Sequence, residues 1–205
     1  MEAIITDSKD TRCPLIDEKQ ARQHIRELLK MIGEDPDREG LIGTPDRILR
    51  MWKEIFRGYD PAQKPKITTF DNEDGITDII FDSGDYYSMC EHHILPFFGK
   101  YYFAYIPSCN GRILGISKVA RVIGYCAAKM QLQERLAKEA VEMLSEALNN
   151  EHQGMALVMK GTHLCKSMRG VKNQGKMTVA YLSGCFKTNS EARKEFYKLI
   201  DLQDG

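Results

Sequence analysis

The sequence predicts an α+β fold in which one antiparallel sheet has helices on one face, with a helical arm at the N-terminus. Three observations support this prediction: apolar residues have helical spacing near the N-terminus, β-branched and aromatic runs begin at Lys66, and two groups of strands are separated by a pair of helices. Strands and helices that do not alternate one by one favour an antiparallel sheet. We expect the helical arm over residues 1–62 and one compact unit over residues 63–205.

The predicted arm contains two amphipathic helices. Gly33 ends the first, and the second has Thr44 as its N-cap, Pro45 at its first helical position and Gly58 after its end. The apolar stripe of the first helix is Ile25, Leu28, Leu29 and Ile32, and that of the second is Ile48, Leu49, Trp52, Ile55 and Phe56.

The remaining elements follow from changes in apolar periodicity along the chain. Strands are predicted over residues 67–70, 79–81 and 98–106, helices over 117–130 and 132–148, strands over 155–160 and 177–186, and a last helix from Ser190.

The composition is that of an ordinary globular protein. The chain has 205 residues, of which 42% are hydrophobic and 28% are charged, and a chain of this length buries roughly 70% of the surface that its unfolded form exposes. It therefore needs neither disulfides nor a structural metal for stability. Lysine plus arginine equals aspartate plus glutamate at 29 each, so the charge gives no reason to expect nucleic acid or a membrane surface as the main partner.

We expect a cytoplasmic location. The first ten residues carry acids and no apolar export segment, and no stretch approaches the ~18 apolar residues of a membrane-spanning helix. The six cysteines are therefore expected to be reduced thiols or metal ligands rather than a disulfide framework.

Cysteine and histidine gather in two short segments, each at the end of a predicted strand. The segments are Cys90-Glu91-His92-His93 and His163-Leu164-Cys165. Thiolate and imidazole suit zinc better than magnesium or calcium, which prefer oxygen. We expect Cys90, His93 and Cys165 to be the ligands, because three protein ligands plus water are typical of a catalytic zinc site.

A purely structural interpretation of these residues is the alternative, since free cysteine is commonly buried as a small hydrophobic residue. Two clusters at strand ends favour the metal site over this alternative. The structural interpretation is preferred for Cys126, which lies in an apolar helix, and for three cysteines without a nearby histidine: Cys13, Cys109 and Cys185.

Four motifs form an ordered set in this sequence. They are Ser88-Met89-Cys90-Glu91-His92-His93, Gly115-Ile116-Ser117-Lys118-Val119-Ala120-Arg121, Gln131-Leu132-Gln133-Glu134-Arg135-Leu136 and His163-Leu164-Cys165-Lys166-Ser167-Met168-Arg169-Gly170. Together they closely resemble the GTP cyclohydrolase I family. The resemblance spans nearly the whole chain, with residues 35–47 similar to the family's N-terminal segment and residues 193–199 similar to its C-terminal helix.

The resemblance implies a tunnelling fold (T-fold) and a reaction in which GTP and water give formate and 7,8-dihydroneopterin triphosphate, the entry step to folate and related pterins. It implies that Zn²⁺, held by Cys90, His93 and Cys165, activates water for attack on C8 of the guanine ring.

Two further histidines match the family's proton-handling positions. His163 is the better match for protonating the purine ring nitrogen, and His92 matches a proton-transfer or ribose position. Support of the neighbouring ligand is the alternative for His92. Glu91 stays open between holding a ligand histidine and simply ending a strand.

The resemblance also implies a GTP-binding set. Glu134, with Gln133 beside it, matches the guanine-binding position, where a carboxylate supplies charge-assisted hydrogen bonds; by spacing alone the two are an ordinary polar helix face. A predicted helix start that Ser117 could cap combines cations with free N–H groups, which suits a triphosphate. The implied phosphate and ribose contacts are Ser117, Lys118, Arg121, Arg169, Arg47 and Arg50, each of which is otherwise a solvated surface residue.

The family forms a homodecamer with active sites between subunits, so some basic residues could come from a neighbour. This sequence departs from the family at Val179-Ala180-Tyr181, where hydroxyl side chains are usual.

Other functions fit the sequence less well. A zinc nucleoside deaminase would need His-x-Glu and Pro-Cys-x-x-Cys, and neither occurs. The related nitrile reductase of the queuosine pathway has no need of the zinc ligands. A zinc-stabilised, non-catalytic T-fold assembly or binding protein remains the alternative function, and it predicts damaged proton-handling or phosphate positions.

Overall fold

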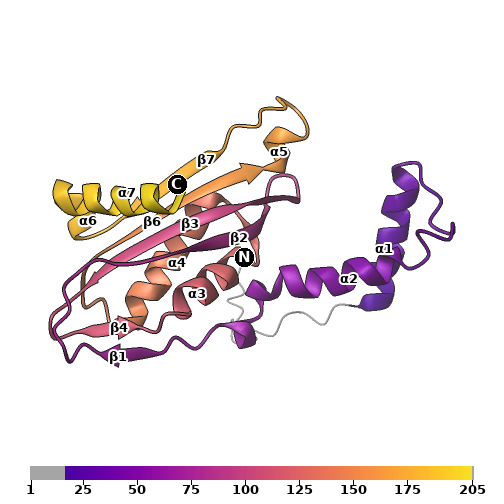
Figure 1. Ribbon diagram of the computed structural model, residues 1–205. Helices are drawn as coiled ribbons and strands as arrows, with labels where there is room; N and C mark the ends of the chain where they lie inside the picture. Colours follow the sequence, from indigo (N-terminus) through magenta and orange to yellow (C-terminus); the bar gives the residue numbers. More distant parts are fainter. Residues whose placement is uncertain (1–16, 205) are drawn as a thin grey trace, which may run out of the picture. The chain divides into compact units, whose positions relative to one another are not determined.

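The computed structural model describes residues 17–204, so Cys13 and the acidic N-terminal residues lie outside the described part. The chain divides into two compact units, one ending at Gln63 and the other beginning at Lys64 (Figure 1). Within residues 17–204, no helix has the length and apolar character needed to cross a membrane.

The N-terminal unit is helical. It contains α1 (Glu18–Met31), α2 (Thr44–Ile55) and two short 3₁₀ helices, η1 (Arg57–Tyr59) and η2 (Pro61–Gln63). Ion pairs Arg22–Asp46 (2.6 Å) and Lys53–Glu18 (2.5 Å) join α1 to α2.

The N-cap of α2 is Gly43, and the prediction that Thr44 caps this helix is wrong. Proline has no N–H and is tolerated throughout the first turn, where no intrahelical acceptor is available. Because proline fits either the first or the second helical position, Pro45 does not decide whether the helix begins at Thr44 or at Pro45.

The second unit is built on a sheet of five strands in the order β5-β2-β3-β6-β7. The neighbouring pairs are antiparallel except for β2 and β5, which pair in parallel over two residues. A separate two-stranded sheet is formed by β1 and β4. The strands are β1 (Thr69–Asp71), β2 (Ile80–Cys90), β3 (Leu95–Pro107), β4 (Arg112–Leu114), β5 (Met130–Gln131), β6 (His152–His163) and β7 (Met177–Leu182).

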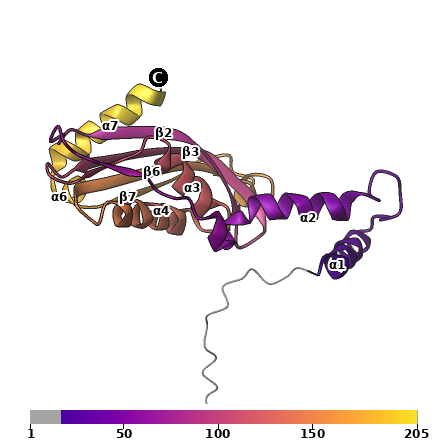
Figure 2. The same ribbon diagram turned by 90° about the horizontal axis from the view of Figure 1, so that it is seen from below.

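The main core lies between one face of this sheet and two helices, α3 (Lys118–Ala127) and α4 (Gln133–Ala147) (Figures 1 and 2). Alternate residues of the strands point to this face, because the side-chain period of a strand is two. Fully buried members include Phe97, Leu136, Leu144 and Leu157. The α+β class with an antiparallel sheet is confirmed.

A smaller core on the opposite face was not anticipated from the sequence. There α6 (Cys185–Thr188) and α7 (Ser190–Asp204) bring Phe186, Phe196 and Ile200 against Tyr102 and Val158. Figure 2 shows α7 on the other side of the sheet from α3 and α4. Helices therefore cover both faces of the sheet, whereas the sequence predicted helices on one face only.

Two predicted elements end earlier than their local pattern suggests. The helix predicted over residues 117–130 stops at Ala127, and Met130 pairs with Met89 of β2 instead. The strand predicted over residues 177–186 stops at Leu182, because Gly184 has a φ of +55° and a Cβ there would lie 2.2 Å from the Gln153 carbonyl oxygen. Tertiary pairing and close backbone approach decide both ends.

The family departure at Val179-Ala180-Tyr181 lies on β7. Val179 and Tyr181 pack against the main core, whereas Ala180 faces the opposite side and is exposed. The larger apolar side chains therefore contribute to the core beneath α3 and α4.

Candidate metal centre

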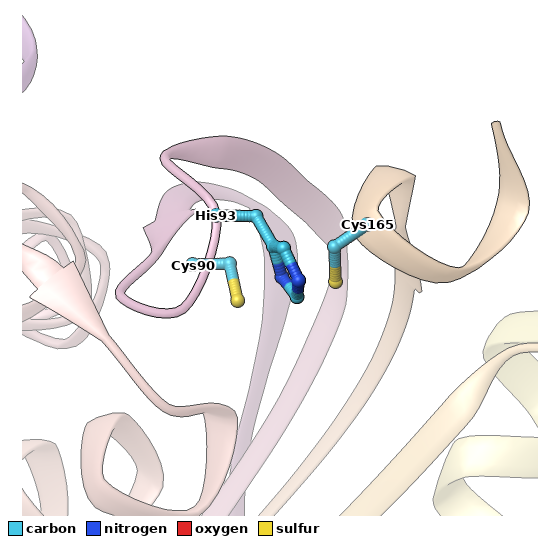
Figure 3. A group of neighbouring side chains, drawn as sticks. All are labelled: Cys90, His93 and Cys165. Carbon is cyan, nitrogen blue, oxygen red and sulfur yellow. The ribbon is translucent and has the colours of Figure 1, made fainter. Parts of the chain in front are cut away.

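Three side chains from two separate segments converge at one end of the sheet. Cys90 is the last residue of β2, His93 lies in the turn before β3, and Cys165 lies in the short helix α5 (Leu164–Ser167) that follows β6. One ligand atom from each lies within 4.8 Å of the other two. Figure 3 shows the three side chains pointing toward one another.

The strand order explains this convergence. β3 lies between β2 and β6, and Phe97 near its start pairs with His163 at the end of β6. The connection after β2 and the connection after β6 therefore lie at the same end of the sheet. On the side of β2 away from β3, Cys90 pairs with Gln131 of β5, and this pairing fixes the residue at which the turn begins.

The turn that carries both histidines has a strained backbone. Ile94 has a φ of +53°, in the left-handed region that β-branched residues rarely adopt, and its N–H donates to the Cys90 carbonyl oxygen at 3.0 Å. A backbone held in this region costs about 1–3 kcal/mol and persists where the surroundings determine it. The hydrogen bond from Ile94 to Cys90 therefore closes the turn that carries His92 and His93.

Glu91 forms an ion pair with Arg135, and within residues 17–204 no hydrogen bond joins it to a histidine. Both terminal nitrogens of Arg135 donate to Glu91 Oε2, at 2.7 and 2.8 Å. Of the two interpretations left open for Glu91, support of a ligand histidine is therefore not what the structure shows. The ion pair joins the histidine turn to the first turn of α4.

The donor set fits a soft or borderline metal ion. Two sulfurs and one imidazole nitrogen are the ligands that zinc takes, and hard cations prefer oxygen. Cys90 is buried, Cys165 is half-buried and His93 is exposed, which leaves one side of the group open. Burial and the adjacent Cys90 thiol raise the pKa of the Cys165 thiol.

His163 lies beside this group without belonging to it. Its ring stacks on Phe97 with the ring centroids 4.6 Å apart and the planes 4° from parallel. Its Nε2 lies 2.8 Å from Gln133 Oε1. Burial lowers the pKa of His163, whereas the charge of Glu134 raises it and that of Lys166 lowers it further.

Three more residues of the sequence-based set lie at this end of the unit. Glu134 is exposed in the first turn of α4, next to the buried Gln133. His92 is exposed, with its ring centroid 6.2 Å from that of His93. Arg169 is also exposed, and its Nη1 donates to His93 Nε2 at 3.1 Å.

The remaining predicted substrate residues belong to α3 and to the N-terminal unit. Ser117 and Lys118 are at the start of α3, whose last residue, Ala127, accepts a hydrogen bond from Ser88 close to Cys90. A helical rise of 1.5 Å per residue places Lys118 about 14 Å farther along α3, and Arg121 follows one turn after it. Arg47 and Arg50 are exposed residues of α2 in the N-terminal unit.

Ser117 occupies the N-cap position of α3, but its side chain makes no capping hydrogen bond. The expectation that this hydroxyl caps the helix is therefore wrong. Its backbone φ and ψ are −79° and −3°, which are close to helical values, whereas a capping residue typically adopts an extended conformation.

Phe97 and Arg135 belong to this site although the sequence does not predict it. Strand alternation places Phe97 on the core face, but nothing local indicates that His163 is its cross-strand partner. Arg135 belongs to a recognised motif, yet its link to Glu91 spans 44 residues of sequence. Both contacts depend on tertiary structure.

The fold and this group of thiols and imidazoles define an α+β protein with a candidate metal site. The family model described as GTP cyclohydrolase I matches residues 21–201. GTP cyclohydrolase 1 of Caldanaerobacter subterraneus subsp. tengcongensis is 46% identical over 91% of this chain and 98% of that protein. The chain belongs to the GTP cyclohydrolase I family.

A second curated relative gives the same result. GTP cyclohydrolase 1 of Mycobacterium bovis is 37% identical over 98% of this chain and 98% of that protein. A solved structure described as the archaeosine synthase QueF-Like in the apo form has 18% identity and a TM-score of 0.40, covering 52% of this chain and 93% of that chain.

Proposed function

We propose that this protein converts GTP and water to formate and 7,8-dihydroneopterin triphosphate, with zinc held by Cys90, His93 and Cys165. The observation that supports this proposal best is the convergence of these three donors next to a fourth residue, His163, which is not one of them. A metal site of three protein ligands with an open side is typical of catalysis rather than of structure. Family membership supports the choice of GTP.

The metal and the chain have separate roles in this proposal. Zinc bound to these three donors supplies a Lewis acid that makes hydroxide available from water near neutral pH. His163 supplies a proton to the imidazole ring of guanine, since an imidazole can donate and accept protons in successive steps. In this proposal His92, which is exposed on the turn that carries His93, serves the later proton transfers at the ribose.

The charged residues around the donors suit the substrate. Glu134 lies at the start of α4, where its carboxylate can accept hydrogen bonds from the N1 and N2 edge of guanine. A neutral imidazole has one lone pair, so a His93 that binds metal cannot also accept from Arg169 at the same nitrogen. The exposed Arg169 guanidinium is then available for a phosphate oxygen.

We expect the triphosphate site to be completed by a neighbouring subunit. Lys118 and Arg121 lie at the end of α3 away from the three donors. Next to them Ile116 is 91% exposed and Phe70 is 57% exposed, which is unusual for large apolar side chains that lie close together. β7 is the last strand of the five-stranded sheet within the described residues, so it offers an edge for pairing with another chain. These features support the ring-shaped oligomer that the family resemblance implies.

Incubation of the purified protein with GTP and zinc tests the proposed reaction. We expect formate and, after oxidation, a fluorescent pterin, each in amounts equal to the GTP consumed. The non-catalytic alternative predicts a zinc-loaded, assembled protein that leaves GTP unchanged. A chelator should abolish turnover, and added zinc should restore it.

Complementation between inactive chains tests the shared site. Co-expression of His163→Ala with Arg121→Ala should give mixed assemblies in which roughly one quarter of the sites combine an intact metal end with an intact α3 start from the neighbour. We expect activity to return to about that fraction of wild type. Size-exclusion chromatography and mass spectrometry of the assembly would establish mixing.

The structure offers a matched control for this experiment. Arg169 contacts His93 of its own chain, so His163 and Arg169 lie at the same end of one subunit. Mixing His163→Ala with Arg169→Ala should therefore restore no activity. Restoration by this second pair, or none by the first despite mixing and zinc loading, would contradict the proposed arrangement.

A further inference from the structure

Gln133 is a polar residue in an almost fully buried position. It is the first residue of α4, and only 1% of its surface is exposed. Its Nε2 donates to the Met159 carbonyl oxygen at 2.8 Å and to the Met177 carbonyl oxygen at 3.2 Å. An amide NH₂ has two hydrogens, so both are used by main-chain acceptors on β6 and β7.

These two hydrogen bonds determine the orientation of the amide. A carbonyl oxygen can only accept, so the end of the Gln133 side chain that faces Met159 and Met177 must be the nitrogen. The oxygen, Oε1, then faces His163 Nε2 at 2.8 Å. Since Oε1 can only accept, Nε2 of His163 carries the hydrogen of this bond.

His163 is thereby held in one orientation and one tautomer. Stacking on Phe97 fixes the plane of the ring, and the bond to Gln133 fixes which edge of the ring faces α4. In a neutral imidazole with hydrogen on Nε2, the lone pair is on Nδ1. Nδ1 is therefore the nitrogen left free for chemistry.

The neighbouring strand leaves room for this arrangement. A Cβ on Gly161 would lie 2.6 Å from Gln133 Oε1 and 2.3 Å from the Tyr86 hydroxyl. The buried Tyr86 hydroxyl has no hydrogen-bond partner in the described part of the chain, so it does not compete with His163 for Oε1. Glycine at this position keeps the amide oxygen in place.

We infer that Gln133 is a positioning residue for His163 and not a guanine contact. Its amide holds the hydrogen on Nε2, so Nδ1 is the nitrogen that takes up a proton from water and passes it to the substrate. This differs from the substrate-binding role that the family resemblance implied for Gln133, because both amide hydrogens are bonded to main-chain carbonyls, Oε1 accepts from His163, and the residue is only 1% exposed. The inference rests on the proposed function only for what His163 does to GTP.

Steady-state kinetics of Gln133→Met separate positioning from binding. We expect kcat to fall about 10–100-fold, as for other residues that orient a functional histidine, with the KM for GTP and the zinc content little changed. A guanine contact would instead raise KM with little effect on kcat, and that result would overturn the inference.

Gln131→Met is the matched control. Gln131 is likewise 1% exposed, and its Nε2 donates to the Cys126 carbonyl oxygen and to Glu139. Its pairing with Cys90 is a main-chain pairing that the substitution leaves in place, and within the described residues no hydrogen bond joins its side chain to His163. If both variants lose thermal stability to the same extent, the loss comes from replacing a buried polar side chain and not from a change at His163. An equal fall of kcat in both variants would overturn the specific role of Gln133.

Solid-state ¹⁵N NMR of the intact protein tests the tautomer without any turnover. The chain has five histidines, so labelled histidine gives few signals, and His163→Gln identifies the signal of His163. We expect a protonated, hydrogen-bonded Nε2 and an unprotonated Nδ1 in the wild type. The opposite tautomer in the wild type would overturn the inference even if the protein converts GTP. If the protein does not convert GTP, the proposed function fails, but the NMR measurement still tests the tautomer of His163.

Gly161→Ala provides a second variant that leaves Gln133 itself unchanged. The added Cβ should displace Gln133 Oε1, so we expect the Nε2 signal of His163 to shift as it does in Gln133→Met. Tyr86→Phe is its control, because it removes a hydroxyl without a partner and leaves the amide in place. An unshifted His163 signal in a folded Gly161→Ala variant would contradict the inference.

Discussion

Replacement of Cys165 by serine is expected to remove metal and activity together. Cys165 is the donor that the end of β6 brings to Cys90 and His93, and without it two protein ligands remain. A serine hydroxyl is a poor substitute for a thiolate as a zinc ligand. We expect zinc to fall from about one ion per chain to nearly none, and turnover to fall by more than the ~100-fold that follows loss of a residue supporting a ligand.

Metal analysis and formate release measure this effect. Cys185→Ser is the matched control, because Cys185 is also a half-buried free cysteine in the second unit and is not part of the Cys90, His93 and Cys165 group. The control should retain its zinc. Full metal occupancy in Cys165→Ser would remove Cys165 from the ligand set.

Replacement of His163 by alanine is expected to separate metal binding from catalysis. His163 contacts Gln133 and Phe97 but is not one of the three donors. The variant should therefore retain zinc and its fold, and turnover should fall by at least ~10², which is the usual effect of losing a general acid.

His152→Ala is the control for this second prediction. His152 begins the same strand that His163 ends, it is also half-buried, and burial likewise lowers its pKa. Its Nε2 lies 2.7 Å from the Ser145 hydroxyl, away from the donor group. Zinc content and circular dichroism should be alike in both variants, and near wild-type turnover in His163→Ala would exclude the acid role.

Much of the candidate site was accessible from the sequence because its residues occur in short motifs. Cys90, His93 and Cys165 were identified from donor type and strand-end position, and the structure brings them within 4.8 Å of one another. The start of α7 at Ser190 and the meander from β2 to β3 likewise follow from local periodicity. The local pattern predicts a helix or a strand correctly when the residues that form the element also bury one of its faces.

Contacts between distant segments could not be predicted in this way. The Glu91–Arg135 ion pair, the stacking of His163 on Phe97 and the second core beneath α7 each join residues from different elements. The role of Gln133 changed for the same reason: as a helix-start glutamine it resembles a substrate contact, and only its burial against β6 and β7 shows that its amide is already bonded.

The sequence by itself determined the α+β class and indicated Cys90, His93 and Cys165 as candidate metal ligands, because residue type fixes donor chemistry and spacing fixes the apolar face of each element. Only the tertiary structure decided which nitrogen of His163 is free and that Glu91 pairs with Arg135. It also decided that Lys118 and Arg121 lie at the end of α3 away from the three donors. The physical reason is that hydrogen-bond direction and distance depend on strand order and register, which are set by packing across the whole unit.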